Sequence, residues 1–257
     1  MPKEHTVVKG IVLRSVDTKE SDKILTVLTA GMGKIPVVAK GARSRRSKVT
    51  AATQLLAYSE LVLSESHGWQ YLNEASTIEL FDGVRQDIEL LSLASYFAEL
   101  TEAVSYGEAE AGDILSLLLN ALYALSALKK PPQLVKPAFQ FRLMALAGYE
   151  PMADGCALCG APQPENPMLD VVHGVVHCGK CREKGGLSLP LTASGLAALR
   201  YVLYGDPRRL YSFSLPPEGL RALNHAADAY VSAQLERSFR TLDYYKTILP
   251  QEETKYE

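Results

Sequence analysis

The sequence predicts an α+β protein in which a small closed β-barrel is followed by a bundle of helices with a cysteine-containing insertion. Three observations support this prediction. The first 80 residues hold short runs of β-branched residues between glycine turns, apolar residues after Phe81 take helical spacing, and two CxxC pairs interrupt the helical part. We therefore divide the 257-residue chain into domains at residues 1–80 and 81–257, with the insertion at residues 153–186.

Five strands are expected in the first part, at Val7–Val16, Lys23–Thr29, Ile35–Ala39, Gln54–Glu65 and Trp69–Leu80. The turns "AGMGK" at 30–34 and "SHG" at 66–68 separate the second strand from the third and the fourth from the fifth. Five short strands without an intervening helix are most economically closed as an OB-fold barrel, although an SH3-like barrel fits the strand count almost as well.

Helical spacing governs the second part of the chain. The first helix carries Ile88, Leu91, Ala94 and Ala98 along one face. Further helices are expected at Ile114–Leu128, Leu134–Ala147, Thr192–Tyr204 and Pro217–Thr241. The prolines at 131–132 precede the third helix and Gly148 follows it, which are the positions that these residue types prefer at helix ends.

The insertion contains two CxxC pairs, "CALC" at 156–159 and "CGKC" at 178–181, separated by 18 residues. This spacing is typical of a tetrahedral four-thiolate zinc site with Cys156, Cys159, Cys178 and Cys181 as ligands. An iron–sulfur site or a redox pair is the alternative. Between the pairs, "LDVVHGVVH" predicts a short hairpin that turns at His173–Gly174.

Four cysteine ligands leave no open coordination position, so we interpret the zinc ion as structural rather than hydrolytic. His173 and His177 are alternative ligands, but four sulfurs are already available and we expect both to be hairpin residues. The chain lacks a phosphate loop, a dinucleotide fingerprint, a nucleophile elbow and an HExxH motif; "GMGK" at 31–34 has the glycines of a phosphate loop without the spacing. We therefore expect the protein not to be an enzyme.

Composition places the chain among ordinary globular proteins, with 47% hydrophobic and 22% charged residues. No apolar run approaches the roughly 20 residues that a membrane helix needs, and "MPKEHTVVKG" lacks the pattern of a signal peptide. We expect a cytoplasmic protein without a membrane partner, in a reducing compartment where cysteines bind metal rather than form disulfides.

Charge is divided unequally along the chain, although the formal net charge is only −2. Residues 1–50 contain eleven Lys or Arg and four Asp or Glu, a formal charge of +7, which leaves −9 for the other 207 residues. The stretch "KGARSRRSK" at 40–48 alone holds five basic residues and no acidic one. The basic end is suited to binding polyanions, and the acidic remainder to keeping the protein in solution.

Three interpretations of "KGARSRRSK" compete: a solvated loop, a nuclear targeting signal and a phosphate-binding loop. The targeting signal is short and has no supporting context. A loop that leaves the third strand of a barrel able to bind single strands favours phosphate binding, and several cations on one surface give salt-sensitive, sequence-independent affinity. Gly41, Ala42, Ser44 and Ser47 are expected to leave the loop flexible enough to follow a nucleic-acid backbone.

Aromatic side chains, on which single-strand binders stack bases, are absent from residues 1–57. Tyr58, Trp69 and Tyr71 fall in the later strands, and Trp69 is the best candidate for stacking. We expect Trp69 instead to be packed in the barrel. Affinity should then come chiefly from charge, with little discrimination among sequences and with binding of duplexes as well as single strands.

The stretches "KESDKILTVLTAGMGK" at 19–34 and "VVAKGARSRRSK" at 37–48, with the helical middle and the "GCALCG…CGKC" insertion, resemble the bacterial RecO family of DNA repair and recombination mediators. The resemblance runs from "VVKGIVLRS" at 7–15 to "ERSFRTLDYY" at 236–245. It implies binding of single- and double-stranded DNA through an OB-fold, annealing of complementary strands, and loading of RecA, together with RecR, onto strands coated by the single-strand-binding protein, SSB. It also implies that the helical domain recognises the acidic C-terminal tail of SSB, that the protein is nucleoid-associated, and that the zinc site is scaffold.

Residue by residue, the resemblance assigns DNA contacts to Lys40, Arg43, Arg45, Arg46 and Lys48 in the matching motif. Arg14, Lys19, Lys23 and Lys34 are added because they belong to the same basic barrel. A cationic barrel would lower the repulsion between two strands without reading bases, and the acidic remainder would confine DNA to it. The rival function is a zinc-stabilised adaptor that binds proteins through its helices and leaves the loop solvated. An enzyme with a site too dispersed to recognise is a third hypothesis.

Overall fold

The structure is a computed structural model that describes residues 5–107, 110–181 and 186–249. These residues form two compact units: the first runs to Leu115 and takes in the chain again from Phe239, and the second comprises Ser116–Ser238. Within the described ranges, no helix is both long enough and apolar enough to cross a membrane. The division of the chain at residue 81 into separate domains stays a prediction.

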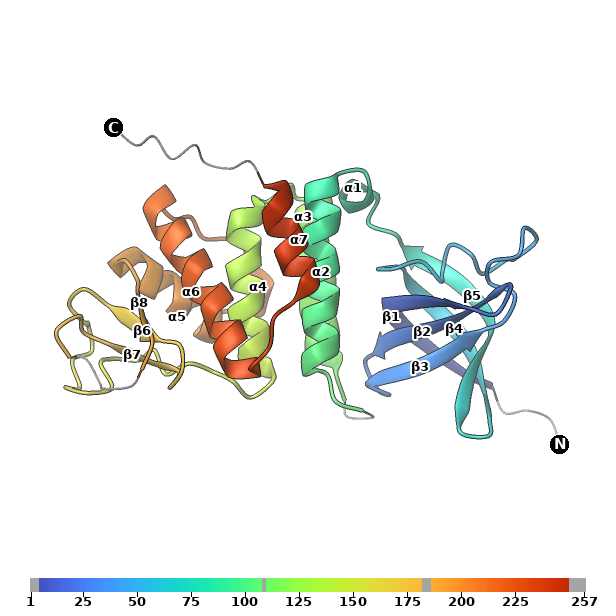
Figure 1. Cartoon of the computed structure of the whole chain (residues 1–257), viewed down its shortest axis with the longest axis horizontal. Helices are drawn as coiled ribbons and strands as arrows, with labels where there is room; N and C mark the ends of the chain where they lie inside the picture. Colours follow the sequence, from blue (N-terminus) through green and yellow to red (C-terminus); the bar gives the residue numbers. More distant parts are fainter. Residues whose placement is uncertain (1–4, 108–109, 182–185, 250–257) are drawn as a thin grey trace. The chain divides into compact units, whose positions relative to one another are not determined.

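Five strands close into a barrel at the start of the first unit (Figure 1). They are β1 (His5–Thr18), β2 (Asp22–Thr29), β3 (Lys34–Ala39), β4 (Tyr58–Ser66) and β5 (Trp69–Glu79). Their order around the barrel is β1-β2-β3-β5-β4, with β3 and β5 parallel and the other pairs antiparallel. This closed five-stranded arrangement confirms the predicted OB-fold.

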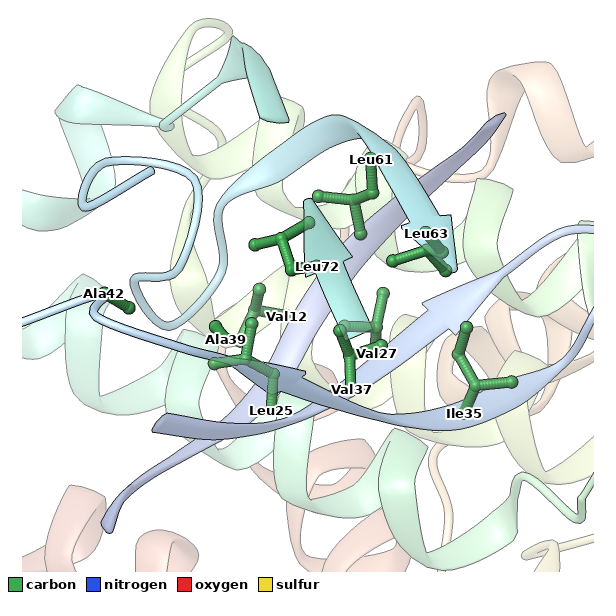
Figure 2. Close-up of a cluster of buried hydrophobic side chains, with 10 residues drawn as sticks. All are labelled: Val12, Leu25, Val27, Ile35, Val37, Ala39, Ala42, Leu61, Leu63 and Leu72. Atoms are coloured by element: carbon green, nitrogen blue, oxygen red, sulfur yellow. The ribbon is translucent and has the colours of Figure 1, made fainter. Parts of the chain in front are cut away.

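Alternating residues of all five strands fill the barrel (Figure 2). The buried cluster consists of Val12, Leu25, Val27, Ile35, Val37, Ala39, Leu61, Leu63 and Leu72, with Ala42 added from the loop after β3. Successive residues of a strand point to opposite faces, so the β-branched runs supply every second side chain to this core. In β1 the register with β2 shifts between Val12 and Arg14, and this β-bulge leaves Ile11, Val12 and Leu13 all buried.

The two ends of β4 differ in how well sequence predicts them. Ser66 pairs with Trp69, and between them His67 and Gly68 have φ values of 53° and 76°, the two positive angles of a type I′ hairpin turn. At its start, β4 begins at Tyr58, four residues after the predicted Gln54. The preceding residues instead form turns that hydrogen-bond to Val12 of β1, whose N–H donates to the carbonyl of Ala57.

Helices α1 (Asp82–Arg85), α2 (Ile88–Val104) and α7 (Arg240–Ile248) complete the first unit. The carboxylate of Asp87 caps α2 by accepting from the N–H groups of Glu89 and Leu90. Helix α7 packs on α2: the rings of Tyr96 and Phe239 meet edge to face with centroids 5.7 Å apart. The end of the chain therefore returns to the unit in which it began.

The second unit combines helices with a small sheet. It contains most of α3 (Gly112–Ser126), with α4 (Pro132–Leu146), β6 (Met168–Asp170), β7 (Val175–His177), β8 (Ser188–Pro190), α5 (Ala193–Tyr204), the 3-10 helix η1 (Pro207–Arg209) and α6 (Pro217–Leu235). The sheet order is β7-β6-β8. A buried ion pair joins α4 to α6, with Lys136 Nζ 2.5 Å from Asp228 Oδ1, and Gln140 donates to the same carboxylate oxygen at 3.0 Å.

The predicted helix Pro217–Thr241 is wrong, because the chain breaks into α6 and α7. Glu236, directly after α6, has φ 49°, in the left-handed region that ends a helix. Phe239 is then only 1% exposed and precedes α7 in an extended conformation. The burial of Phe239 beside Tyr96 depends on tertiary packing, which the apolar spacing of one helix does not reveal.

Gly10 lies on β1 where a side chain would collide with β2. A Cβ atom there would lie 2.6 Å from Cγ1 of Val27 and 2.9 Å from the carbonyl oxygen of Leu28. Gly10→Ala is therefore expected to lower the free energy of unfolding by about 1–3 kcal/mol through overpacking, measured by urea denaturation. Gly31→Ala is the matched control, since no atom lies within 4 Å of its Cβ position. Equal losses in both variants would contradict the close approach.

Candidate nucleic-acid interface and metal centre

The basic loop at 40–48 is anchored to the barrel at several points. Ala42 is completely buried in the barrel core. The N–H of Gly41 donates to Asp22 Oδ1 at 2.8 Å, and the N–H of Arg43 donates to the carbonyl of Ser21 at 2.9 Å. Gly41 also has φ 63°, which favours glycine. These contacts anchor the start of the loop, where Gly41 fits the turn and Ala42 fits the core; the flexibility of the rest of the loop stays a prediction.

Three basic side chains of this loop are free to bind a ligand. Arg45, Arg46 and Lys48 are exposed and form no hydrogen bond or ion pair with any residue in the described ranges. Arg43 differs, because its Nε lies 3.2 Å from Asp17 Oδ2 and its Nη1 donates to the carbonyl of Glu20 at 3.4 Å. Arg43 thus helps to hold the loop against the β1–β2 turn.

The other predicted cations near the loop have different surroundings. Lys19 is exposed in the β1–β2 turn. Lys40 Nζ lies 4.9 Å from the centroid of the Tyr71 ring, and Lys23 Nζ donates to the carbonyl of Thr53 at 3.3 Å. The seven basic residues at this end of the barrel are Lys19, Lys23, Lys40, Arg43, Arg45, Arg46 and Lys48, against the acidic Asp17, Glu20 and Asp22, a formal local charge of +4.

Arg14 and Lys34 lie apart from this cluster, beside α2. Arg14 Nε is 3.1 Å from Glu102 Oε1, and Lys34 Nζ donates to the backbone carbonyl of the same Glu102 at 2.7 Å. Lys34 begins β3, whereas the basic loop follows its last residue, Ala39, about 17 Å further along at the usual rise per residue. The structure therefore brings seven of the nine predicted residues together and places two at the opposite border.

An apolar strip crosses the outer face of the barrel between these two borders. The pairing register aligns Val16 with Ile24, Ile24 with Val38, and Val38 with Tyr71, across β1, β2, β3 and β5. Their inward neighbours, such as Leu25 and Val37, fill the core, so the aligned residues point outward. Trp69 lies two residues before Tyr71 on β5, on the same face. We call Val16, Ile24, Val38, Tyr71 and Trp69 the apolar strip.

Three members of the apolar strip are exposed, Val16 at 46%, Ile24 at 36% and Trp69 at 45%, and the other two, Val38 and Tyr71, are half-buried. The expected packing of Trp69 inside the barrel is therefore wrong, because its place directly after the two-residue turn puts the indole outside the closed part of the sheet. Further toward α2, beyond the pair Arg14–Thr26, Ile11 pairs with Leu28 and both are completely buried. The open face thus ends where Arg14 and Lys34 meet Glu102.

The four cysteines form the second candidate site. The Sγ atoms of Cys156, Cys159, Cys178 and Cys181 all lie within 4.8 Å of one another, and those of Cys159 and Cys178 are 3.9 Å apart. Four sulfurs about 2.3 Å from a tetrahedral ion would be about 3.8 Å apart. The cluster is therefore close enough to bind one metal ion.

Backbone N–H groups stabilise the thiolate form of Cys156, which is the form that binds a metal ion. Burial opposes ionisation of Cys156, but N–H groups of Cys159, Cys178 and Leu158 donate to its sulfur, and the pKa falls to about 6. Burial and the neighbouring sulfurs of Cys156 and Cys159 raise the pKa of Cys178. A thiolate at one cysteine thus opposes ionisation of the next cysteine by electrostatic repulsion. A bound divalent cation would offset that repulsion.

The histidines of the hairpin are occupied by other partners. Nδ1 of His177 contacts the carbonyl of Cys178 and Nε2 contacts Ser188 Oγ, each at 2.8 Å. Nδ1 of His173 lies 2.7 Å from Oδ2 of the buried Asp170. Hydrogen bonds from His173 and from the N–H of Val172 outweigh burial and lower the pKa of Asp170. Asp170 therefore closes the hairpin turn at 171–174.

Arg200 is a structural residue that sequence reasoning missed. From α5, its Nε donates to the carbonyl of Ala153 at 2.7 Å, and its Nη2 donates to the carbonyls of Asp154 and Pro162 at 2.9 and 2.8 Å. These carbonyls flank the first CxxC pair, so Arg200 links α5 to the cysteine-containing part of the unit at residues 152–181 and 186–190, which we call the metal lobe. No sequence motif marks Arg200, because its partners are backbone atoms about 40 residues away.

Comparison with known proteins identifies relatives along nearly the whole chain. Two family models match: Recombination protein O N terminal at residues 3–81 and Recombination protein O C terminal at residues 85–243. The DNA repair protein RecO of Acetivibrio thermocellus is 32% identical over 239 residues, 93% of this chain and 95% of the relative. The proteins of the same name from Symbiobacterium thermophilum and Anaeromyxobacter dehalogenans are 29% and 32% identical over 244 residues, 94% of this chain and 96% of each relative.

Loss of a metal ion bound by the four cysteines is expected to unfold the part of the chain around them. Cys156→Ser, or a chelator added to the unaltered chain, is expected to lower the melting temperature, because binding of a structural ion is coupled to folding. Circular dichroism melts and native mass spectrometry, with one ion per chain expected, provide the measurement. Leu158→Ser is the control, since this exposed side chain lies in the same turn and is not a ligand. A melting temperature that changes neither with chelator nor with Cys156→Ser would contradict a structural metal.

Proposed function

This chain belongs to the RecO family of DNA repair proteins, and on that premise we propose that it binds single- and double-stranded DNA through its barrel and anneals complementary strands. We further propose that, together with RecR, it helps to load RecA onto single strands coated by SSB. The observation that carries the proposal is the anchored loop with three unpaired cations at the edge of an OB-fold face. Such a loop contacts phosphates without loss of loop entropy and without reading bases.

The nine predicted cations divide into three roles in this proposal. Arg45, Arg46 and Lys48, with exposed Lys19 and Lys40, contact phosphates directly. Arg43 and Lys23 position the loop through Asp17 and Thr53. Arg14 and Lys34 receive the strand at the α2 border of the face. Annealing follows from charge, since a surface of formal charge +4 lowers the repulsion between two polyanions.

We propose zinc as the metal of the four-cysteine cluster. Four thiolates in a closed tetrahedral arrangement suit Zn²⁺ and leave no position for a reacting water. The ion would therefore hold the lobe, and the proposed function involves no covalent catalysis. The proposed setting is the cytoplasm, on nucleoid DNA, with the acidic C-terminal tail of SSB as a further ligand of the helical part.

The rival function is a zinc-stabilised adaptor that binds proteins and not DNA. Exposed apolar side chains in the metal lobe favour it: Met152 is 65% exposed, Val172 51% and Leu187 53%. Apolar side chains gathered on one lobe are suited to a protein partner. Salt-dependent DNA binding separates the two functions, because only the mediator requires it.

Replacing the three unpaired cations tests the proposed function. Arg45→Ala/Arg46→Ala/Lys48→Ala should weaken binding to both strand types, measured by fluorescence anisotropy of labelled oligonucleotides across a salt series. Each phosphate contact contributes about 0.7 to the salt slope for single strands and about 0.9 for duplexes, so the slope should fall by about 2 and about 2.7. Because none of the three side chains has a hydrogen-bond or ion-pair partner among residues 5–107, 110–181 and 186–249, the fold should persist.

The matched control removes three cations elsewhere. Arg208, Arg209 and Arg221 are exposed on η1 and α6, and their triple alanine variant should leave DNA affinity unchanged. Equal losses in the two variants would mean that net charge alone governs binding. If the unaltered chain does not bind DNA even at low salt, the adaptor function becomes the better explanation.

Glu102 is expected to limit DNA affinity by pairing with Arg14. Glu102→Gln should raise single-strand affinity by roughly two- to five-fold at low salt, the range expected from breaking one partly exposed ion pair and releasing its cation. Glu60→Gln makes the same change of charge on β4, among the acidic residues of the barrel, and should have a smaller effect. Anisotropy titrations compare the single-strand affinities of the two variants. Equal increases in affinity would argue against a local action of Glu102.

A further inference from the structure

We propose that the apolar strip binds unpaired bases, so that this face of the barrel selects single strands and releases the bases once they pair. The inference rests on the proposed function, because it assumes that the adjoining loop holds phosphates. It adds a second binding element with its own chemistry, and it names the part of the nucleic acid that this element recognises.

The strip has the composition and exposure of a stacking surface. Trp69 and Tyr71 are its aromatic members, and Trp69 is nearly half exposed. Three aliphatic residues, Val16, Ile24 and Val38, continue the surface across the neighbouring strands. Four strands about 4.8 Å apart give it a width of about 14 Å, enough for a few bases side by side. Aromatic surfaces of this kind bind bases of any sequence, since every base has a π face.

The charges around the strip identify its occupant. Lys40 sits over the ring of Tyr71 at one border, next to the loop cations, and Arg14 lies at the other border. An apolar surface with cations on both sides fits a ligand whose apolar parts alternate with negative charges. Single-stranded DNA has that arrangement, with bases in reach of the strip and phosphates in reach of Lys40 and Arg14. A protein segment would need closely spaced acidic residues to match it.

The strip and the loop therefore respond differently to base pairing. Phosphates are accessible in single and double strands alike, so the loop holds both. In a duplex the faces of the bases are stacked on one another and unavailable, so the strip holds single strands alone. When two strands anneal, the bases leave the strip and only the phosphate contacts remain. Loss of the stacking contacts lowers the affinity for the annealed duplex relative to the single strands and promotes release of the duplex.

The single tryptophan of the chain makes this inference directly measurable. With the full-length protein, an oligo(dT) strand should quench Trp69 emission, and an equal amount of preformed dT·dA duplex should leave it nearly unchanged. Adding oligo(dA) to the quenched complex should restore emission. A dT strand with abasic positions should bind through its phosphates and quench less.

Variants separate the strip from the loop. Trp69→Ala should lower single-strand affinity by about ten-fold, within the range for loss of one base stack, and change duplex affinity by less than two-fold; Trp69→Phe should retain most of the affinity. Ile24→Ser is expected to act in the same direction. Ile78→Ser is its control, because Ile78 is 47% exposed, more than Ile24 at 36%, and lies near the far end of β5.

The outcomes distinguish the inference from the proposed function. If labelled oligo(dT) binds while Trp69 emission stays constant, or if abasic and normal strands quench equally, the strip does not bind bases and the proposed function still stands. If Trp69→Ala lowers the affinity for single strands and for duplexes by the same factor, selection of unpaired bases is likewise overturned. If neither strand type binds at low salt, the proposed function fails and the inference fails with it.

Discussion

Closure of the barrel through the parallel pairing of β3 with β5 is the constraint on which the proposed interface depends. It places Tyr71 beside Val38, and thereby extends the outer face of β1, β2 and β3 onto a strand that carries aromatic residues. It also ends β3 at the rim of the core, where Ala42 can turn inward. The buried methyl group of Ala42 and the cap of Gly41 by Asp22 then fix the direction in which Arg45, Arg46 and Lys48 project. The same geometry that fills the core thus places the proposed phosphate contacts beside the proposed base contacts.

Local patterns in the sequence predicted most of the fold and the clustering of the four cysteines, and tertiary register determined the rest. Alternating β-branched runs located the strands, and the two CxxC pairs located the cysteine cluster, because each signal lies within a few consecutive residues. The exposure of Trp69 depends on where β5 joins β3, and the break before Phe239 depends on a partner in α2. Neither is visible in local spacing. The pinning of Arg43 by Asp17 is likewise set by the packing of two loops.

The negative charge of the chain after residue 50 is itself unevenly distributed. Residues 51–115 hold twelve Asp or Glu and one Arg, a formal charge of −11, whereas residues 116–238 hold twelve Lys or Arg and nine Asp or Glu, +3. The acidic remainder therefore belongs mainly to β4, β5 and the first helices, in the same unit as the basic loop. Strands β4 and β5 carry four Glu and no Lys or Arg. A polyanion is thus attracted to one side of the barrel and repelled by the other.

In the proposed function, carboxylates within the basic face help the protein to release DNA. Asp17 and Glu102 form ion pairs with Arg43 and Arg14, and Asp22 accepts a hydrogen bond from the backbone of the loop. Each fixes the geometry of a cation or a turn and lowers the net charge that a strand meets. A mediator that neutralised every phosphate in reach would bind its product as tightly as its substrates, because phosphates persist after pairing. In the proposed function, a modest positive charge attracts the strands, and the apolar strip adds binding free energy only while the bases are unpaired. Binding would therefore be tighter before annealing than after it.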